Sequence, residues 1–248
     1  MFAAAPAELG CRVERIGSAV VLIMPSFPIT LFNRVLCLGL NVPATETMLD
    51  TIGSLYEQAH IKTYAVQIGN VFLPAELPAW LANHHFVSGQ NWAKVTRSPD
   101  SSITVPTSLR VEQISSDRAA DFAHVIPLAF GMPPFLMPWM LALVGRTGWQ
   151  HYVAYDGDIP AAAGALYIRD EIGWLGIGGT LPAYRNRGAQ GAIMAARIRA
   201  ASDAGCKWII TETGEDTPDN PNPSYHNMLR TGFKLAYLRA NYIHETHG

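Results

Sequence analysis

The sequence predicts a mixed α/β (α+β) fold built from two related halves. In the second half, apolar and β-branched runs of strand length alternate with helical segments, and one run enters a helix through a basic, glycine-containing loop at residues 181–192. The first half repeats this order of segments without the loop. The length of 248 residues exceeds one typical domain, and 49% hydrophobic with 15% charged residues is ample for a large buried core.

The loop has the chemistry of an anion site. The first amides of a helix lack intrahelical acceptors and the helix dipole places partial positive charge beside them, so a diphosphate satisfies both. Small residues let a phosphate approach the backbone, and arginines add charge. The alternative is an ordinary solvated helix start, and neither a Walker loop nor a dinucleotide fingerprint fits the spacing. The residues expected at the site are Arg185, Arg187, Gly188, Ala189, Gln190, Gly191 and Ala192.

The pattern Arg185-x-x-Gly188-x-Gln190 resembles the acyl-CoA pyrophosphate loop of the GNAT superfamily of N-acetyltransferases, which usually reads Gln/Arg-x-x-Gly-x-Gly/Ala. Gln190 departs from that pattern and is expected to bring a larger side chain near the diphosphate. The resemblance covers residues 108–245 and implies a GNAT fold, with a mixed central sheet flanked by helices. The segments that follow the GNAT order are strands at 150–159, 160–167 and 172–180, the loop with its helix at 187–204, a strand at 206–213, a helix at 224–230 and a strand at 234–243.

The resemblance also implies an activity. The chain would transfer an acyl group, most simply acetyl, from acetyl-CoA or another acyl-CoA to a primary amine of a small molecule or peptide. A base must take a proton from the amine, the thioester oxygen must be stabilised, and the leaving thiolate can accept a proton. In the family, the strand before the loop offers backbone groups to the pantetheine and the thioester. These groups correspond here to the edge from Gly178 through Gly179, Thr180 and Leu181.

The last short helix is the expected source of the acid. Family members carry a tyrosine there, and its position is Met228 in this chain. Tyr225, one helical turn earlier, is the substitute candidate, with core packing as its alternative role. Ser224 and Asn227 are further polar groups expected near the cofactor.

The expected base is a carboxylate near the end of the strand that follows the loop helix. Glu212 is the first candidate, with Glu215 and Glu171 behind it. The alternative role of such a strand-end carboxylate is plain solvation.

The first half lacks the features of the loop. Its helix start at 44–50 holds carboxylates and no glycine, so it is well capped but repels a diphosphate. We therefore expect one cofactor per chain and a first half that packs on the catalytic half and walls the acceptor pocket; a chance similarity of two α/β segments is the alternative. The matching segments are an apolar strand at 34–43, a helix at 44–59, a strand at 62–68, a short helix ending near Phe86 and a strand at 90–97.

The predicted domains are a degenerate GNAT-like domain at 1–98, a polar linker at 99–107 and the GNAT domain at 108–248. After a strand at 109–114 and a helix over 116–130, residues 131–145 are dense in Met, Phe and Trp. This segment is predicted to be either a wall of the acceptor pocket or plain core.

Charge and composition limit the other possibilities. The net charge of −2 gives no reason to expect nucleic acid, and the arginines within 185–199 indicate a local phosphate site. No apolar run is long enough to span a bilayer and no secretory segment is evident, so no membrane partner and a cytoplasmic location are expected.

Cys11, Cys37 and Cys206 have no metal-ligand spacing, so reduced core thiols and no metal are expected. We expect a monomer or homodimer. The competing functions are a non-catalytic acyl-CoA sensor and a structural protein on a GNAT-like scaffold.

Overall fold

The computed structural model describes residues 5–69, 73–99 and 103–245, and the chain divides into two compact units. The amino-terminal unit consists of Met1–Trp92 with Tyr237–Gly248, and the central unit is Ala93–Ala236. These units differ from the predicted 1–98 and 108–248 because the end of the last strand, residues 240–245, pairs antiparallel with residues 63–68 of the amino-terminal unit. Of the predicted linker, residues 100–102 lie outside the described residues.

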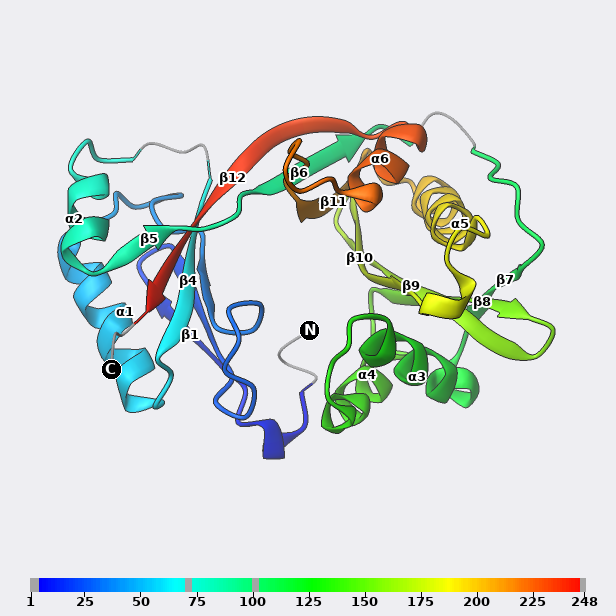
Figure 1. Cartoon of the computed structure of the whole chain (residues 1–248), viewed down its shortest axis with the longest axis horizontal. Coiled ribbons are helices and arrows are strands. Elements are labelled where there is room, and N and C mark those ends of the chain that lie inside the picture. Colours follow the sequence, from blue (N-terminus) through cyan, green and yellow to red (C-terminus); the bar gives the residue numbers. More distant parts are fainter. Residues whose placement is uncertain (1–4, 70–72, 100–102, 246–248) are drawn as a thin grey trace. The chain divides into compact units, whose positions relative to one another are not determined.

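The amino-terminal unit is a sheet with two α-helices (Figure 1). Its strand order is β1-β2-β3-β4-β12, with β5 paired to β12. Strands β1 to β3 are antiparallel, and β3 is parallel to β4. The elements are η2 (Ala7–Leu9), β1 (Arg12–Ile16), β2 (Ala19–Ile23), β3 (Arg34–Leu36), α1 (Glu46–Gln58), β4 (Thr63–Ile68), α2 (Leu77–Asn83), β5 (Phe86–Ser88) and the end of β12 (Lys234–Glu245).

Local backbone chemistry sets two boundaries in this unit. The strand predicted over 34–43 stops after three residues, because Cys37 and Gly39 adopt left-handed φ angles of 61° and 77° that a strand cannot continue through. Cys37 is exposed, so the prediction of a core thiol is wrong there, whereas Cys206 is buried. Helix α1 begins as expected, since the Thr45 hydroxyl accepts a hydrogen bond from the Met48 amide.

The central unit has helices on both faces of a larger sheet. Its strand order is β6-β11-β10-β9-β8-β7. Helices α3 and α4 cover one face and α5 covers the other (Figure 1). The elements are β6 (Trp92–Arg97), β7 (Arg110–Ile114), η3 (Ser116–Arg118), α3 (Ala119–Ala129), η4 (Pro134–Leu136), α4 (Met137–Leu143), β8 (Trp149–Asp156), β9 (Ile159–Arg169), β10 (Ile172–Thr180), η5 (Pro182–Tyr184), α5 (Ala189–Asp203), β11 (Trp208–Gly214), α6 (Pro223–Arg230) and the start of β12.

The two units share a topology. In the central unit, β8, β9 and β10 are antiparallel, and β10 is parallel to β11 after the α5 crossover. Strands β1, β2 and β3, helix α1 and strand β4 repeat that arrangement. The duplication predicted from the sequence is therefore present in the backbone.

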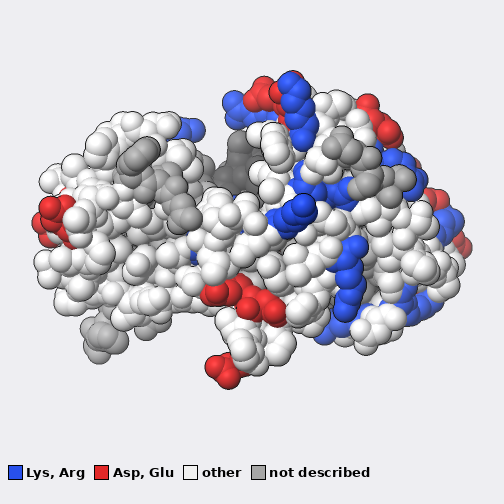
Figure 2. Space-filling view, turned by 90° about the horizontal axis from the view of Figure 1, so that it is seen from above, with Lys and Arg blue, Asp and Glu red and all other residues white. Residues whose placement is uncertain are grey.

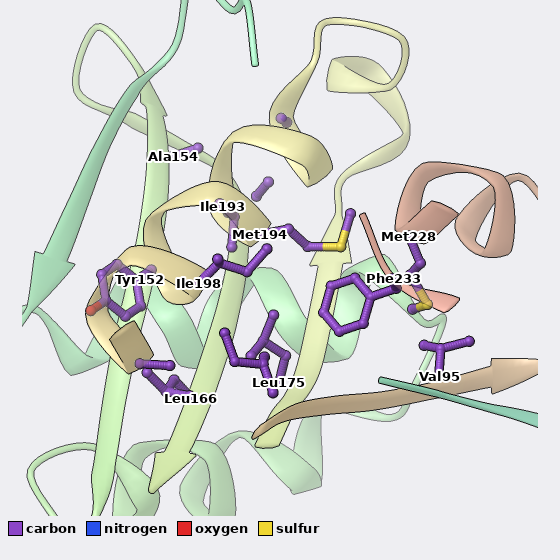
Figure 3. Close-up of a cluster of buried hydrophobic side chains, with 14 of the residues drawn as sticks. Val95, Tyr152, Ala154, Leu166, Leu175, Ile193, Met194, Ile198, Met228 and Phe233 are labelled. Atoms are coloured by element: carbon purple, nitrogen blue, oxygen red, sulfur yellow. The ribbon is translucent and has the colours of Figure 1, made fainter. Parts of the chain in front are cut away.

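The core of the central unit lies between α5 and the sheet (Figure 3). Ile193 and Ile198 of α5 pack with Leu175 of β10, and Phe233 and Val95 close the same cluster. Each of these side chains is at least nine-tenths removed from solvent, which is the main stabilisation available to the unit.

The segment dense in Met, Phe and Trp is partly core, as one of its two predicted roles required. Trp139 and Met140 of α4 are buried, while Phe135 is 43% exposed, and the role of acceptor wall stays a prediction. No helix in the described part of the chain is long and apolar enough to cross a membrane.

Candidate functional site

Helix α5 begins without a side-chain cap, as do α2, α3 and α4. Gly188 is its N-cap residue, in a left-handed conformation, and no side chain accepts a hydrogen bond from the first turn, which also holds no acidic residue. In α6, by contrast, Asn222 caps the helix, and in α1 Thr45 does so. The first amides of α5 and its dipole are therefore available to an anion, and the anion site itself stays a prediction.

The two arginines of the loop have different environments. Arg187 donates to both carboxylate oxygens of Asp156, at 2.7 and 3.0 Å, and to the Ser108 hydroxyl at 3.2 Å. The hydrogen bonds between them lower the pKa of Asp156 and raise that of Arg187. Arg185 is exposed, and no carboxylate among the described residues pairs with it. Arg187 therefore anchors the loop to the end of β8, and Arg185 faces solvent.

The glycines of the loop admit a neighbouring segment of the chain. A Cβ on Gly188 would stand less than 3.0 Å from the Pro106 carbonyl oxygen, and one on Gly191 equally close to the Val105 side chain. The Thr107 hydroxyl donates to a carbonyl of the same loop at 2.8 Å. Part of the predicted linker is thus packed on the start of α5. We expected these glycines to give a phosphate room, but Pro106 and Val105 lie where their Cβ atoms would stand, so the backbone amides of the first turn are what the loop offers to an anion.

The Gln190 side chain is turned toward α6. Its amide nitrogen donates to the Ser224 hydroxyl and its amide oxygen accepts from the Asn227 side chain, both at 2.7 Å. Arg230 in turn donates to the Asn227 oxygen at 2.9 Å. Three residues predicted around the cofactor are thus brought together. Gln190, where the side chain departs from the family pattern, therefore clamps α5 to α6 through its two polar atoms.

The strand that leads into the loop loses its parallel neighbour. The ladder between β10 and β11 ends with Trp174 opposite Ile210, although β10 continues to Thr180 and β11 to Gly214. The Thr211 hydroxyl donates a hydrogen bond of 2.6 Å to the next β10 carbonyl, that of residue 175. Beyond it, the β10 edge has no ladder partner in β11.

On its other side, β10 contains a bulge. Its register with β9 shifts between Gly176 and Gly179. Ile177, inside the bulge, has φ 51°, which is rare for a β-branched residue. Of the four backbone positions expected to meet the cofactor, Gly178 lies in this bulge, and Gly179 and Thr180 follow it. The Leu181 amide donates to a β9 carbonyl at 2.9 Å.

Glu212 lies on the same face of the sheet as Trp174. Trp174 is paired with Ile210, and Glu212 is two residues further along its strand. Its carboxylate is 2.6 Å from the Lys94 ammonium, with side chains 13% and 20% exposed. Glu171 pairs instead with Lys207 at 2.6 Å before β10, and the nine residues of that strand, roughly 30 Å, separate it from the loop. Glu171 is therefore too far away to be the base.

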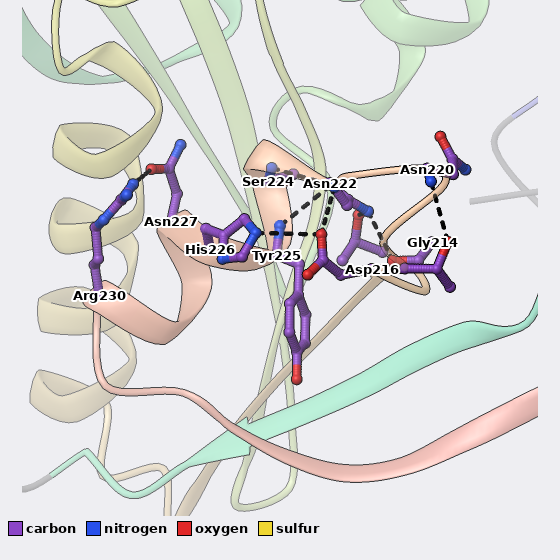
Figure 4. Close-up of polar contacts among 11 residues, drawn as sticks. Gly214, Asp216, Asn220, Asn222, Ser224, Tyr225, His226, Asn227 and Arg230 are labelled. Atoms are coloured by element: carbon purple, nitrogen blue, oxygen red, sulfur yellow. Dashed lines mark hydrogen bonds and ion pairs between the residues drawn. The ribbon is translucent and has the colours of Figure 1, made fainter.

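Helix α6 carries two side-chain hydroxyls, those of Ser224 and Tyr225, and Gln190 holds the first of them. Met228, at the position of the family tyrosine, is buried in the core (Figure 3). Tyr225 is half-buried against the same core, and its hydroxyl bonds to none of the described residues. The start of the helix is fixed because Asn222 accepts hydrogen bonds from the amides of Ser224 and Tyr225 and is itself held by Asp216. Tyr225 points away from that cluster (Figure 4).

The sequence reasoning missed an aromatic cluster on the same face as Glu212. Trp149, Tyr167 and Trp174 lie directly opposite one another on β8, β9 and β10. Their ring centroids are 4.9 Å apart for Trp149 and Tyr167 and 6.0 Å for Trp149 and Trp174. The Trp174 ring fills the space over Gly176, beside the bulge. Aligning the hairpin registers from the turns would have shown these three residues in one row.

Charge around the site is local. On the face drawn in Figure 2, Lys and Arg side chains are separated by uncharged and acidic groups. In the ranges 5–69, 73–99 and 103–245, no three His, Cys, Asp or Glu side chains form a group that could hold a metal ion.

Comparison with known proteins finds relatives through the fold. No protein-family model and no curated protein matches the chain. A GCN5-related N-acetyltransferase from Kribbella flavida has a TM-score of 0.68 at 15% identity, over 96% of this chain and 90% of that one. A functionally unknown conserved protein from Staphylococcus epidermidis has a TM-score of 0.67 at 13% identity, over 96% and 95%. A tandem GNAT protein from the clavulanic acid biosynthesis pathway has a TM-score of 0.64 at 13% identity, over 94% and 82%. The predicted fold is confirmed: the chain has the fold of these GNAT structures.

Proposed function

We propose that the chain is an acyl-CoA-dependent N-acyltransferase that moves an acetyl group from acetyl-CoA to a primary amine of a small molecule or peptide. One observation carries the proposal: a strand edge without a ladder partner in β11 is followed, after η5 and the basic loop, by the start of α5, which has no side-chain cap. An unpaired edge binds an extended chain of amides through backbone hydrogen bonds, and a helix start binds a diphosphate. Coenzyme A carries pantetheine and diphosphate joined in this order.

The residues present fit this cofactor at the backbone. The amides of residues 189–191 and the Arg185 guanidinium would hold the diphosphate, and the edge from Gly178 to Thr180 would hold the pantetheine. The clamp made by Gln190 fixes α6 beside them. When bound, acetyl-CoA supplies the thioester that the amine attacks.

The side chains in reach can handle the protons. Glu212 takes the proton that the ammonium must lose, and the Lys94 ammonium lies 2.6 Å from that carboxylate. The amine nitrogen then bonds to the acetyl carbon while the carbon–sulfur bond breaks. Tyr225 gives its proton to the departing thiolate, since its hydroxyl is not committed elsewhere in the described structure.

We expect acetyl-CoA to raise the melting temperature by roughly 5 °C or more at a hundredfold excess over its Kd. An amine library should then release free thiol. Arg185→Glu should weaken acetyl-CoA binding by about tenfold or more, because it places a negative charge beside the diphosphate. The sequence grouped Arg199 with the phosphate site, but it is exposed ten residues after the first residue of α5, roughly 15 Å along the helix, so Arg199→Glu is the matched control. Calorimetric titration that detects no binding to the unmodified chain would refute the proposal.

The acceptor side indicates an amine with an apolar or aromatic body. The face beside the bulge presents Trp174 and its two aromatic neighbours, and Glu212 there is already neutralised by Lys94. A polycation would need several unpaired carboxylates, whereas one ammonium on an aromatic body matches the aromatic face. Trp174→Ala should raise the KM for such an amine about tenfold and leave the Kd for acetyl-CoA unchanged. Trp208→Ala, at an exposed tryptophan on β11, should change neither; equal effects of the two substitutions would contradict the assignment.

A second candidate is an acyl-CoA-binding protein without transferase activity. The observation that favours it is Met228, which places a core methionine where the family has its tyrosine. Acetyl-CoA binding without thiol release on any amine, and no further effect of Tyr225→Phe, would select this candidate.

A further inference from the structure

The core of the central unit holds a positive charge that the proposed anion site does not use. Arg197 of α5 is 4% exposed, although the sequence grouped it with the arginines of the phosphate loop. Burial lowers its pKa from 12.5 to about 10, so the side chain stays charged at neutral pH. No ion pair in the described part of the chain includes it. A buried charge without a counter-ion persists only where hydrogen bonds replace its hydration.

Those hydrogen bonds come from the β10 bulge. One terminal nitrogen of Arg197, Nη1, donates to the Ala165 carbonyl at 2.9 Å and to the Gly176 carbonyl at 3.2 Å. Ala165 and Gly176 are the last residues paired in register before the shift. The guanidinium therefore bridges β9 and β10 where their ladder breaks. Its Nε donates to the Ile193 carbonyl at 3.3 Å, which ties the same group to α5.

Glycines make room for the guanidinium. A Cβ on Gly164 of β9 would lie 2.9 Å from the central carbon of Arg197, and one on Gly178 of β10 would lie 3.4 Å from its Nη2. Gly178 is inside the bulge, so the charged group lies directly behind it. The glycines that interrupt these apolar strands are thus explained by the side chain they accommodate.

The bulge itself is strained. Ile177 is held at φ 51°, a conformation that β-branched residues avoid. Such a conformation persists only where its surroundings fix it, and strain of this kind collects at functional sites. Arg197 supplies that restraint from the α5 side, since it ties the last paired residues of β9 and β10 to one guanidinium.

We propose that Arg197 is a positioning residue for acyl transfer: it holds the bulge so that the backbone amides of residues 178–180 keep a fixed orientation at the strand edge, and it places positive charge behind the thioester oxygen. The inference rests on the proposed function, because the thioester is assigned to this edge by that proposal. Fixed donors and charges aimed at a developing oxyanion lower the barrier without changing how tightly the ground state binds.

The test compares Arg197→Met and Arg197→Lys with Arg199→Met in the full chain. Methionine keeps the length of the side chain and removes charge and donors, while lysine keeps the charge but cannot bridge two carbonyls with a planar fork. Arg199 is exposed on the same helix and serves as the control. Hydrogen exchange of the cofactor-free proteins, acetyl-CoA titration and steady-state kinetics are measured for each.

In Arg197→Met we expect amide exchange at residues 176–180 to accelerate about tenfold or more, with the Kd for acetyl-CoA within about threefold of the unmodified value and kcat about a hundredfold lower. Arg197→Lys should lose about tenfold in kcat. Because it keeps the charge, it tests the positioning role of Arg197 if the methionine variant does not fold. Unchanged exchange, or a loss in Kd as large as that in kcat, would overturn the inference. If the unmodified chain does not bind acetyl-CoA, the proposed function fails, and the exchange experiment still decides whether Arg197 holds the bulge.

Discussion

Gly188→Ala is expected to destabilise the chain by about 3 kcal/mol and to weaken acetyl-CoA binding. Gly188 has φ 76°, and a Cβ there would press on the Pro106 carbonyl oxygen. The left-handed conformation costs an L-residue about 1–2 kcal/mol, and the displaced segment adds overpacking of about 1–3 kcal/mol. Urea unfolding measures the stability change, and calorimetric titration measures the binding change.

Gly205→Ala provides a matched control for this substitution. Gly205 also has φ 76°, just after α5, but no atom lies within 4 Å of where its Cβ would stand. Its replacement should therefore cost only the conformational term, about 1 kcal/mol, and leave acetyl-CoA binding unchanged. If the two alanine variants are equally stable, residues 105–107 do not hold the start of α5 as the structure indicates.

Those elements of the site that depend on local chemistry were predictable from the sequence. The loop helix was expected over 187–204 and is observed as Ala189–Asp203, because its apolar spacing and its terminal glycine are local signals. The strands of the central unit are likewise close to their predicted positions. The capped start of α1 was readable in the same way, from Thr45 and the carboxylate beside it.

The partners of these elements could not be predicted, because partner choice is not local. The end of β12 pairs with β4 in the amino-terminal unit, while Val95 of β6 belongs to the core of the central unit. The two strands were expected to complete their own halves, and nothing in their composition specifies which sheet each one joins. The cut at 99–107 was chosen from loop composition alone, and the described part of that segment packs on the start of α5.

Arg197 was missed although its position carries a signal. It is four residues after Ile193 and four before Ala201, and both are buried, so it lies on the apolar face of α5. From residue type alone, however, an arginine on such a face is predicted to be exposed. Only the pairing of β9 with β10 shows that the two carbonyls to which it donates lie opposite each other where the ladder shifts.

A buried histidine should make the central unit lose stability in mild acid. His151 of β8 is 1% exposed between the rings of Phe122 and Trp149, and burial lowers its pKa from 6.5 to about 4. The unfolded chain therefore binds a proton more readily than the folded chain between these values. The contribution of His151 to stability is fully present above pH 6.5 and is lost as the pH falls toward 4, by about 3 kcal/mol in total.

His151→Leu isolates this effect from the titration of carboxylates, because leucine is apolar and His151 Nε2 has no hydrogen-bond partner to lose. Urea unfolding of both proteins between pH 7.5 and 4 should give curves that run parallel above pH 6.5 and separate below it, with the unmodified chain losing more. His124→Gln, at an exposed histidine on α3, should follow the unmodified chain throughout, since its surroundings change little on unfolding. Curves for His151→Leu that stay parallel down to pH 4 would mean that water or a shift of β8 accommodates the imidazolium, and that the aromatic face is open enough to hydrate a charge.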